Sequence, residues 1–468
     1  MKRFLSDNTL LAALIAASVA LTACGGGGGS DNGGSGSSAP VSNISPAKPS
    51  NAQDTPASTP SGLTPETPAS APAAASTPAG ADPASGTGTT GGNDTPPPVQ
   101  VADNTVPIVI DSNVGRVVNM PYVSVTFCVP GKQDASQCAS VDHMLLDTGS
   151  VGVRVIASAL GPAFGDKLPL QTGAINDSTG KAAIAQCALF ASGYTWGSTR
   201  AADVTIGKKT ASGIPVQLIG DSVFPTTPTD CSSRGAGLNT VAALGANGIV
   251  GIGHLAQDYP DAARYALSAT YYYCPTPSSC TAARVPLNRQ TANPVAAFAA
   301  DNNGTIIRLP MLPSTGRASV TGELVFGIGT RDNNALPSWP TFLAVSDRGA
   351  FTSNYKDRTM TSIVDSGSNG LFFPDSTLPV LSGWYTPATL QSLSATMMSN
   401  AGNVQSAIGF SIANAQSLFD LGYAAHDNLG APASSIFIWG LPFFYGRNVY
   451  TALSGVQAGT QMGPYVAF

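Results

Sequence analysis

Charged residues and histidine are scarce in this sequence. Asp, Glu, Lys and Arg together make up 10% of its 468 residues, three residues are His, and the formal net charge is −5. Because there is no cluster of Lys and Arg, nucleic acid is not an expected partner. Three scattered His leave little room for a Ser-His-Asp triad, and Gly-x-Ser-x-Gly is absent. We expect no metal and no cofactor.

Long hydrophobic runs are also missing. A membrane-spanning helix takes about 20 apolar residues, and the apolar stretch 10–21 is shorter. Lys2 and Arg3 precede this stretch, which ends in Leu21-Thr22-Ala23-Cys24. The pattern resembles a bacterial lipobox and predicts a signal peptide over residues 1–23. An ordinary signal peptide with a chance Cys is the alternative.

Lipidation of Cys24 would make the protein a lipoprotein. Palmitate and related acyl chains on one residue anchor a protein to a membrane surface without spanning it. Gly25 follows the Cys, where lipoproteins retained at the inner membrane carry Asp, so the prediction is the outer membrane of the cell envelope. The sequence does not indicate whether the protein lies on the periplasmic side or on the surface side of that membrane.

Residues 24–104 consist mostly of Gly, Ser, Thr, Pro, Ala and Asn. Such a segment cannot bury enough apolar surface to offset the entropy lost on ordering. We therefore predict a disordered tether, with a root-mean-square span of roughly 50 Å.

From residue 105 onward the pattern changes to short strands. Apolar and β-branched residues alternate in several runs between turn residues, namely 122–127, 202–206, 305–309 and 319–326. Helical periods are few, and the clearer ones cover 294–300 and 387–398. The remaining length is too great for one simple sandwich. We predict a mostly β fold of two lobes, 105–300 and 301–468.

Cysteine usage suggests disulfides. If Cys24 carries lipid, six of the seven Cys remain, namely Cys128, Cys138, Cys187, Cys231, Cys274 and Cys280. An even number in an exported chain favours disulfides, and six Cys allow fifteen pairings. Pairing near neighbours joins 128 to 138 and 274 to 280, which leaves 187 with 231. A metal site is the competing interpretation, and the absence of Cys-x-x-Cys argues against it.

Two motifs with the same pattern stand out. Asp147-Thr148-Gly149-Ser150 and Asp365-Ser366-Gly367-Ser368 each follow an apolar run, and they lie 218 residues apart (365 − 147). Either motif alone is common in turns. Together they suggest paired carboxylates that a duplicated fold brings together. Two adjacent carboxylates cannot both ionise easily, so they share a proton.

Three further segments extend this pattern. Segments 247–253 and 437–444 each contain an apolar-apolar-Gly string, and segment 322–327 has a strand-like sequence. In this order the motifs resemble those of pepsin-like (A1-type) aspartic proteases, and the chain is also similar to a group of uncharacterised bacterial lipoproteins. The resemblance implies an all-β bilobal fold with few short helices. It also implies that Asp147 and Asp365 are catalytic, at the bottom of a cleft between lobes.

The resemblance assigns supporting roles to six residues of the two loops, namely Thr148, Gly149, Ser150, Ser366, Gly367 and Ser368. The second residue of each motif would cross-link the loops, and the Gly would let the backbone approach the carboxylates. The final Ser would donate to the outer carboxylate oxygen and favour ionisation, which predicts an acidic optimum. A hairpin flap over the cleft would correspond to residues 190–204.

Tyr194 and Trp196 are the aromatic candidates of that flap, where they could cover substrate or pack the hairpin. The function predicted is a monomeric, lipid-anchored aspartic endopeptidase, a hydrolase acting on a peptide or protein substrate. The alternative is an inactive protein of the same fold that binds a partner in the envelope or at the surface.

Overall fold

The computed structural model describes residues 102–338 and 340–468. Strands dominate these residues, and the longest described helix, α6 (Ala415–Asp420), has six residues. The predicted all-β class with few short helices is therefore confirmed. The predicted signal peptide, Cys24 and nearly all of the tether lie outside the described residues. Among the described residues, no helix has the length and apolarity needed to cross a membrane.

Most strands belong to two sheets, one of fifteen strands and one of seven. The large sheet holds β1 (Thr105–Ile110), β2 (Pro121–Cys128), β3 (Cys138–Asp147), β4 (Val151–Ile156), β5 (Ala183–Phe190), β6 (Gly193–Ile206), β7 (Lys209–Ile219), β8 (Gly248–Ile252), β9 (Tyr271–Thr276), β10 (Ser279–Ala282), β11 (Gly304–Arg308), β12 (Val320–Phe326), β13 (Phe342–Ala344), β23 (Asn448–Ala452) and β26 (Tyr465–Ala467). The smaller sheet holds β14 (Phe351–Tyr355), β15 (Arg358–Val364), β16 (Leu371–Phe373), β19 (Gln391–Met398), β20 (Gln405–Ile412), β21 (Gly430–Pro432) and β22 (Ile436–Trp439).

The remaining elements are small. Two short hairpins are formed by β17 (Val380–Leu381) with β18 (Trp384–Tyr385) and by β24 (Gln457–Ala458) with β25 (Gln461–Met462). The other α-helices are single turns, namely α2 (Ala157–Leu160), α3 (Pro162–Gly165), α4 (Thr229–Ser232) and α5 (Val241–Leu244). Single 3-10 turns cover Ala135–Gln137, Pro260–Ala263, Leu287–Arg289, Val295–Ala297, Asp332–Asn334 and Leu441–Phe443.

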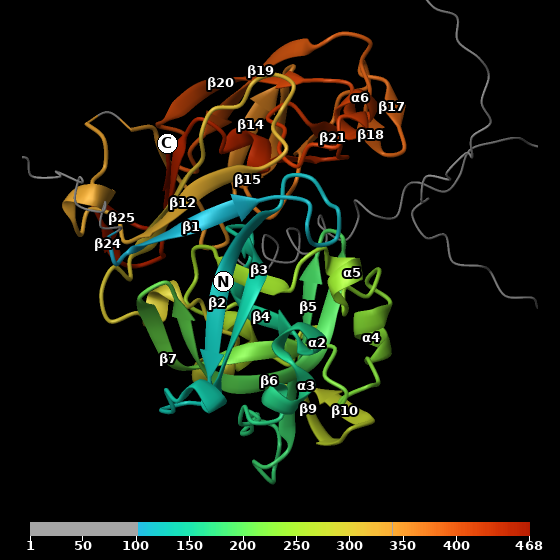
Figure 1. Ribbon diagram of the computed structural model, residues 1–468, viewed down its shortest axis with the longest axis vertical. Coiled ribbons are helices and arrows are strands. Elements are labelled where there is room, and N and C mark those ends of the chain that lie inside the picture. Colours follow the sequence, from blue (N-terminus) through green and yellow to red (C-terminus); the bar gives the residue numbers. More distant parts are fainter. Residues whose placement is uncertain (1–101, 339) are drawn as a thin grey trace, which may run out of the picture. The chain divides into compact units, whose positions relative to one another are not determined.

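Strands from distant parts of the chain meet in the middle of the large sheet. β1 pairs with β2 on one side and with β12 on the other (Figure 1). β11 and β23 follow β12 in the sheet. One sheet thus continues from the N-terminal lobe into strands of the C-terminal half. The lobe boundary at residue 300 stays a prediction, because β1 and β12 lie on opposite sides of it in the sequence.

Each lobe repeats one arrangement of three strands. β8 runs parallel to β3 and antiparallel to β4, so it crosses between the strands that flank Asp147. In the second lobe, β22 runs parallel to β15 and antiparallel to β16. The apolar segments 247–253 and 437–444 contain these crossing strands. β8 is buried throughout, which explains its unbroken apolar sequence.

The helix predicted over residues 387–398 is wrong. Residues 391–398 form strand β19, which pairs with β14 and β20. Along this strand Leu393, Ala395 and Met397 alternate with more exposed residues, and this period of two fits a half-buried strand. The other predicted helix, 294–300, contains only the single 3-10 turn Val295–Ala297.

Three disulfides connect the six predicted Cys, and the pairing of near neighbours is confirmed. Cys128–Cys138 joins the ends of β2 and β3, and Cys274–Cys280 closes the β9–β10 hairpin. Cys187–Cys231 ties β5 to α4. The metal alternative for these Cys is therefore excluded.

Candidate active site

The two Asp loops are cross-linked by hydrogen bonds of the residue that follows each Asp. The Thr148 amide donates to Ser366 Oγ (3.0 Å), and the Ser366 amide donates to Thr148 Oγ1 (2.9 Å). The two hydroxyls in turn donate to backbone carbonyls of the opposite loop, those of Val364 and Leu146. Both side chains are buried. These four bonds hold loops that are 218 residues apart at one place.

Each carboxylate is oriented by its own loop in the same way. The Gly149 amide donates to Asp147 Oδ1 (2.8 Å), and the Ser150 hydroxyl donates to Oδ2 (2.5 Å). In the second loop, the Gly367 amide donates to Asp365 Oδ1 (2.9 Å). The Ser368 hydroxyl completes the pattern by donating to Asp365 Oδ2 (2.6 Å).

The two Gly bring the carboxyl groups together by leaving space. A Cβ placed on Gly149 would lie 2.5 Å from Asp365 Cγ, and one on Gly367 would lie 2.6 Å from Asp147 Oδ1. Neither Gly has a positive φ. The reason for glycine is therefore the close approach of the opposite carboxyl group, and not a backbone angle that other residues resist.

The environment of the two carboxyl groups changes the pKa of Asp365. Burial, the adjacent Asp147 charge and a hydrogen bond to Asp147 raise the pKa of Asp365 to about 8. The Ser368 hydroxyl and the Gly367 amide oppose this rise, because they stabilise the ionised form. We expected from the sequence that the Ser donors would favour ionisation. In the structure, burial and the neighbouring charge outweigh them at Asp365, so the dyad keeps one proton up to neutral pH.

The second loop rests on an aromatic stack. The Asp365 amide donates to the Trp439 carbonyl (3.0 Å), which fixes the end of β15 against β22. The Trp439 ring stacks on Phe437 with centroids 4.2 Å apart, and its indole N–H donates to Ser353 Oγ (3.0 Å). Because Trp439 is fully buried, the loop is held by a rigid support.

A buried ion pair supports the first loop. Arg154 lies on β4, seven residues after Asp147, and its guanidinium contacts the Asp258 carboxylate (2.9 Å). Asp258 also accepts hydrogen bonds from Tyr271 on β9 (2.6 Å) and from Gln186 on β5. Burial raises the pKa of Asp258, and the Arg154 charge opposes that rise. In the sequence, Arg154 is a lone charged residue inside the apolar run 153–156, and this role of Arg154 was not predicted.

The residues predicted to form the flap, 190–204, cover the turn between β5 and β6 and most of β6. Trp196 is 3% exposed, its indole N–H donates to the Phe224 carbonyl (2.9 Å), and its ring meets Tyr272 edge-on. Tyr194 belongs to the same packed cluster as Trp196 and the Cys187–Cys231 disulfide. The structure thus places both predicted aromatics within the packing of the hairpin.

Phe190 is the aromatic residue at the tip of this hairpin, where it pairs with Gly193. It is half-buried, and its ring centroid lies 5.8 Å from the Arg154 guanidinium. Phe190 lies within the predicted flap range but was not one of its aromatic candidates, although the turn-forming Ala191-Ser192-Gly193 directly after it indicates the hairpin tip.

A family model described as "Protein of unknown function (DUF3443)" matches residues 100–468. The chain belongs to this family. Among solved structures, it is similar to the aspartic proteinase from Irpex lacteus, with 16% sequence identity and a TM-score of 0.45. That similarity covers 78% of this chain and 96% of the other. No curated protein matches the sequence.

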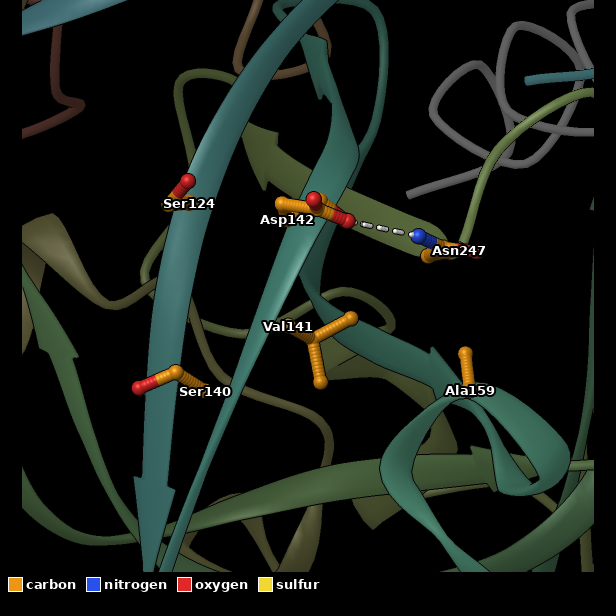
Figure 2. Close-up of a pocket in the computed structure, with 6 residues that line it drawn as sticks. All are labelled: Ser124, Ser140, Val141, Asp142, Ala159 and Asn247. Atoms are coloured by element: carbon orange, nitrogen blue, oxygen red, sulfur yellow. Dashed lines mark hydrogen bonds between the residues drawn. The ribbon is translucent and has the colours of Figure 1, made fainter. Parts of the chain in front are cut away.

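The protein also has a surface hollow, lined by Ser124, Ser140, Val141, Asp142, Ala159 and Asn247 (Figure 2). Asn247 spans part of it by donating to Asp142 Oδ1 (3.1 Å). Neither catalytic candidate lines this hollow. Within the described residues, no group of three His, Cys, Asp or Glu side chains is arranged to hold a metal ion.

Proposed function

We propose that this protein is an aspartic endopeptidase that hydrolyses peptide bonds with Asp147 and Asp365. The observation that carries the proposal is the close approach of the two carboxyl groups across Gly149 and Gly367, at a site where burial and the Asp147 charge raise the pKa of Asp365 to about 8. A pair of carboxyl groups that shares one proton offers a base and an acid side by side. The matching donors from Gly149, Ser150, Gly367 and Ser368 support the same assignment.

The proposed reaction uses both protonation states at once. The ionised carboxylate takes a proton from water as the water oxygen bonds to the peptide carbonyl carbon. The protonated carboxyl donates its proton to the carbonyl oxygen, so the tetrahedral intermediate carries no full negative charge. Collapse of this intermediate re-forms the C=O bond and breaks the C–N bond: one of its hydroxyls returns its proton to the ionised carboxylate, and the amine leaves with the proton of the other carboxyl. The dyad then holds one proton again.

Peptide cleavage tests the proposal. Asp147→Asn and Asp365→Asn should each lower kcat about 1,000-fold, because each removes one half of the acid–base pair. We would measure cleavage of a mixed peptide library by the full chain between pH 3 and pH 8, with and without a statine-type inhibitor. Asp142→Asn is the matched control, because Asp142 is an exposed carboxylate on the same strand as Asp147.

Unchanged cleavage in both dyad variants would refute the assignment. Folded wild-type protein that cleaves nothing at any pH would favour the alternative, a protein of the same fold that binds a partner without turnover.

The proposal includes a lipid anchor on Cys24, which would hold the monomeric enzyme at the outer membrane. Its support is the sequence pattern Leu21-Thr22-Ala23-Cys24 after a short apolar stretch. Metabolic labelling with an alkyne analogue of palmitate should mark the wild-type protein and leave Cys24→Ser unlabelled. Equal labelling of the two would contradict the anchor.

A further inference from the structure

The connection between β1 and β2 contacts both lobes beside the dyad. We refer to residues 114–119 as the strap, and Figure 1 shows this connection running between the two lobes. Val117 packs against an N-terminal cluster that includes Ala246, and Val118 packs against a C-terminal cluster that includes Leu418. The strap therefore joins the lobes independently of the Thr148–Ser366 contacts.

Asn119 ends the strap, and it is fully buried with every hydrogen-bonding group of its side chain used. Nδ2 donates to the carbonyls of Asn369 (2.9 Å) and His426 (2.8 Å). Oδ1 accepts from the His426 amide (2.8 Å) and the Tyr445 hydroxyl (3.0 Å). The Asn119 amide donates to Ala424 (2.7 Å). One side chain thus fastens the strap to several segments of the C-terminal lobe.

Two requirements select asparagine at this position. The backbone has φ of +57°, in the left-handed region that Asn tolerates better than most residues with a side chain. The side chain must also donate twice and accept twice, which an amide does and a carboxylate does not. Aspartate would satisfy the backbone and the two acceptor roles only.

The bond to Asn369 reaches the second Asp loop. Asn369 directly follows Ser368, whose hydroxyl donates to Asp365 Oδ2 (2.6 Å). The Thr148 contacts hold the start of this loop at Ser366, and Asn119 holds its end at the Asn369 carbonyl. The Ser368 carbonyl itself accepts from the Leu441 amide (2.7 Å), so Asn119 fixes the next peptide, between Asn369 and Gly370. A shift of that peptide would reach Ser368, and the hydroxyl that orients the Asp365 carboxylate, through Asn369.

We propose that Asn119 is a positioning residue for the second Asp loop, acting through the Asn369 carbonyl and Ser368 on Asp365. The effect of Asn119 on kcat rests on the proposed peptidase function. The mechanical link between strap and loop does not, and it can be measured without any substrate.

The test compares two buried amides with the same bonding pattern. Asn119→Asp keeps the size, the tolerance for positive φ and both acceptors, and removes the donors to Asn369 and His426. Asn334→Asp is the matched control, since Asn334 is also fully buried. Its Nδ2 donates to the Phe326 carbonyl and to Thr330 Oγ1, and its Oδ1 accepts from the amides of Thr330 and Arg331.

We expect Asn119→Asp to lower amide hydrogen-exchange protection in residues 365–371 about tenfold, as befits the loss of one buried hydrogen bond. In the same variant kcat should fall about tenfold while KM stays nearly constant, because the defect lies in the orientation of Asp365 and not in substrate contacts. Asn334→Asp should leave both the protection of 365–371 and kcat unchanged.

Unchanged protection of residues 365–371 in folded Asn119→Asp would overturn the proposal, and so would an equal loss in Asn334→Asp. If the wild type cleaves nothing, the peptidase function fails, and the exchange measurement alone decides the positioning role. Should Asn119→Asp not fold, Asn119→Gly replaces it, because glycine accepts the left-handed backbone and removes the amide without adding charge.

Discussion

The carboxyl of Asp365 receives two hydrogen bonds from its own loop and still has a raised pKa. Such donors alone would lower the pKa. The opposite result follows from burial and from the Asp147 carboxylate, which faces Asp365 across the space left by Gly149 and Gly367. The pKa of Asp365 thus depends on its burial and on the opposite carboxylate more than on the donors of its own loop.

Asp365 makes stability depend on pH. Its folded pKa of about 8 exceeds the unfolded value of 3.8, so between these values the native state binds a proton that the unfolded state has released. The free energy of unfolding should therefore fall as pH rises from about 4 to about 8, by at most about 1.4 kcal/mol per pH unit. Below pH 4 this contribution is fully present.

Urea denaturation at pH 4, 6 and 8 measures this dependence. Asp365→Asn should flatten it, because the amide does not titrate, while Asp142→Asn should keep the wild-type slope. A wild-type slope that persists in Asp365→Asn would show that another group binds the proton.

The sequence predicted the dyad residues because each motif is local and repeated. It did not predict Arg154 or Asn119, whose partners lie 104 residues away at Asp258 and 250 residues away at Asn369. A lone Asn near Gly and Pro has the sequence pattern of a turn residue, and only the packing of the strap shows that all its polar groups are used.

At the scale of elements, the β5–β6 hairpin is held along both edges. β5 pairs with β9 through residues 183–186, and the start of β6 pairs with residues 236–238 through Tyr194. The Cys187–Cys231 disulfide adds a covalent link to α4. These contacts hold both strands of the hairpin up to its tip at Phe190 and Gly193.

The disulfide of this hairpin should contribute more stability than that of β9–β10. Cys187–Cys231 spans 44 residues and Cys274–Cys280 spans six, so loop-closure entropy gives about 4 and about 2 kcal/mol. We expect the double variant Cys187→Ala/Cys231→Ala to lose more unfolding free energy than Cys274→Ala/Cys280→Ala in urea denaturation. Equal losses, or the reverse order, would show that strain or residual structure dominates.

Element type was predictable where the period was clear. The crossing strands β8 and β22 lay in segments whose apolar sequence was recognised, because both are buried in the sheet. β19 was mistaken for a helix, since Leu390, Leu393 and Met397 also recur at helical spacing. Pairing with β14 and β20 decided between the two periods, and such pairing is not visible in the strand itself.

At the scale of the whole molecule, β1 lies between β2 and β12 and so belongs to the structure of both lobes. Its inward residues, Val106, Ile108 and Ile110, pack into the main core cluster. This cluster also contains residues of the C-terminal sheet such as Phe437. The described residues should therefore unfold as one cooperative unit and not lobe by lobe.

Ile108→Ala tests this cooperation. Ile108 is 0% exposed, whereas its neighbour Val109 is 36% exposed. The change should cost about 2–5 kcal/mol of unfolding free energy and lower the temperature of a single calorimetric transition. Val109→Ala on the outward face of the strand should change it far less. Two separate transitions, with only one shifted by Ile108→Ala, would contradict the shared core.

The distance between the two Asp loops along the chain bears on when the protein acquires its chemistry. A ribosome adds about 5–20 residues per second, so roughly ten seconds or more separate the synthesis of the first loop from that of the second. β22 and the strands that complete the shared sheet emerge later still. Until the second loop is made, Asp147 has only the donors of its own loop and lacks the opposite carboxyl group. If the proposed function holds, this topology keeps a nascent or translocating chain from cutting itself or its neighbours, without any separate inhibitory segment.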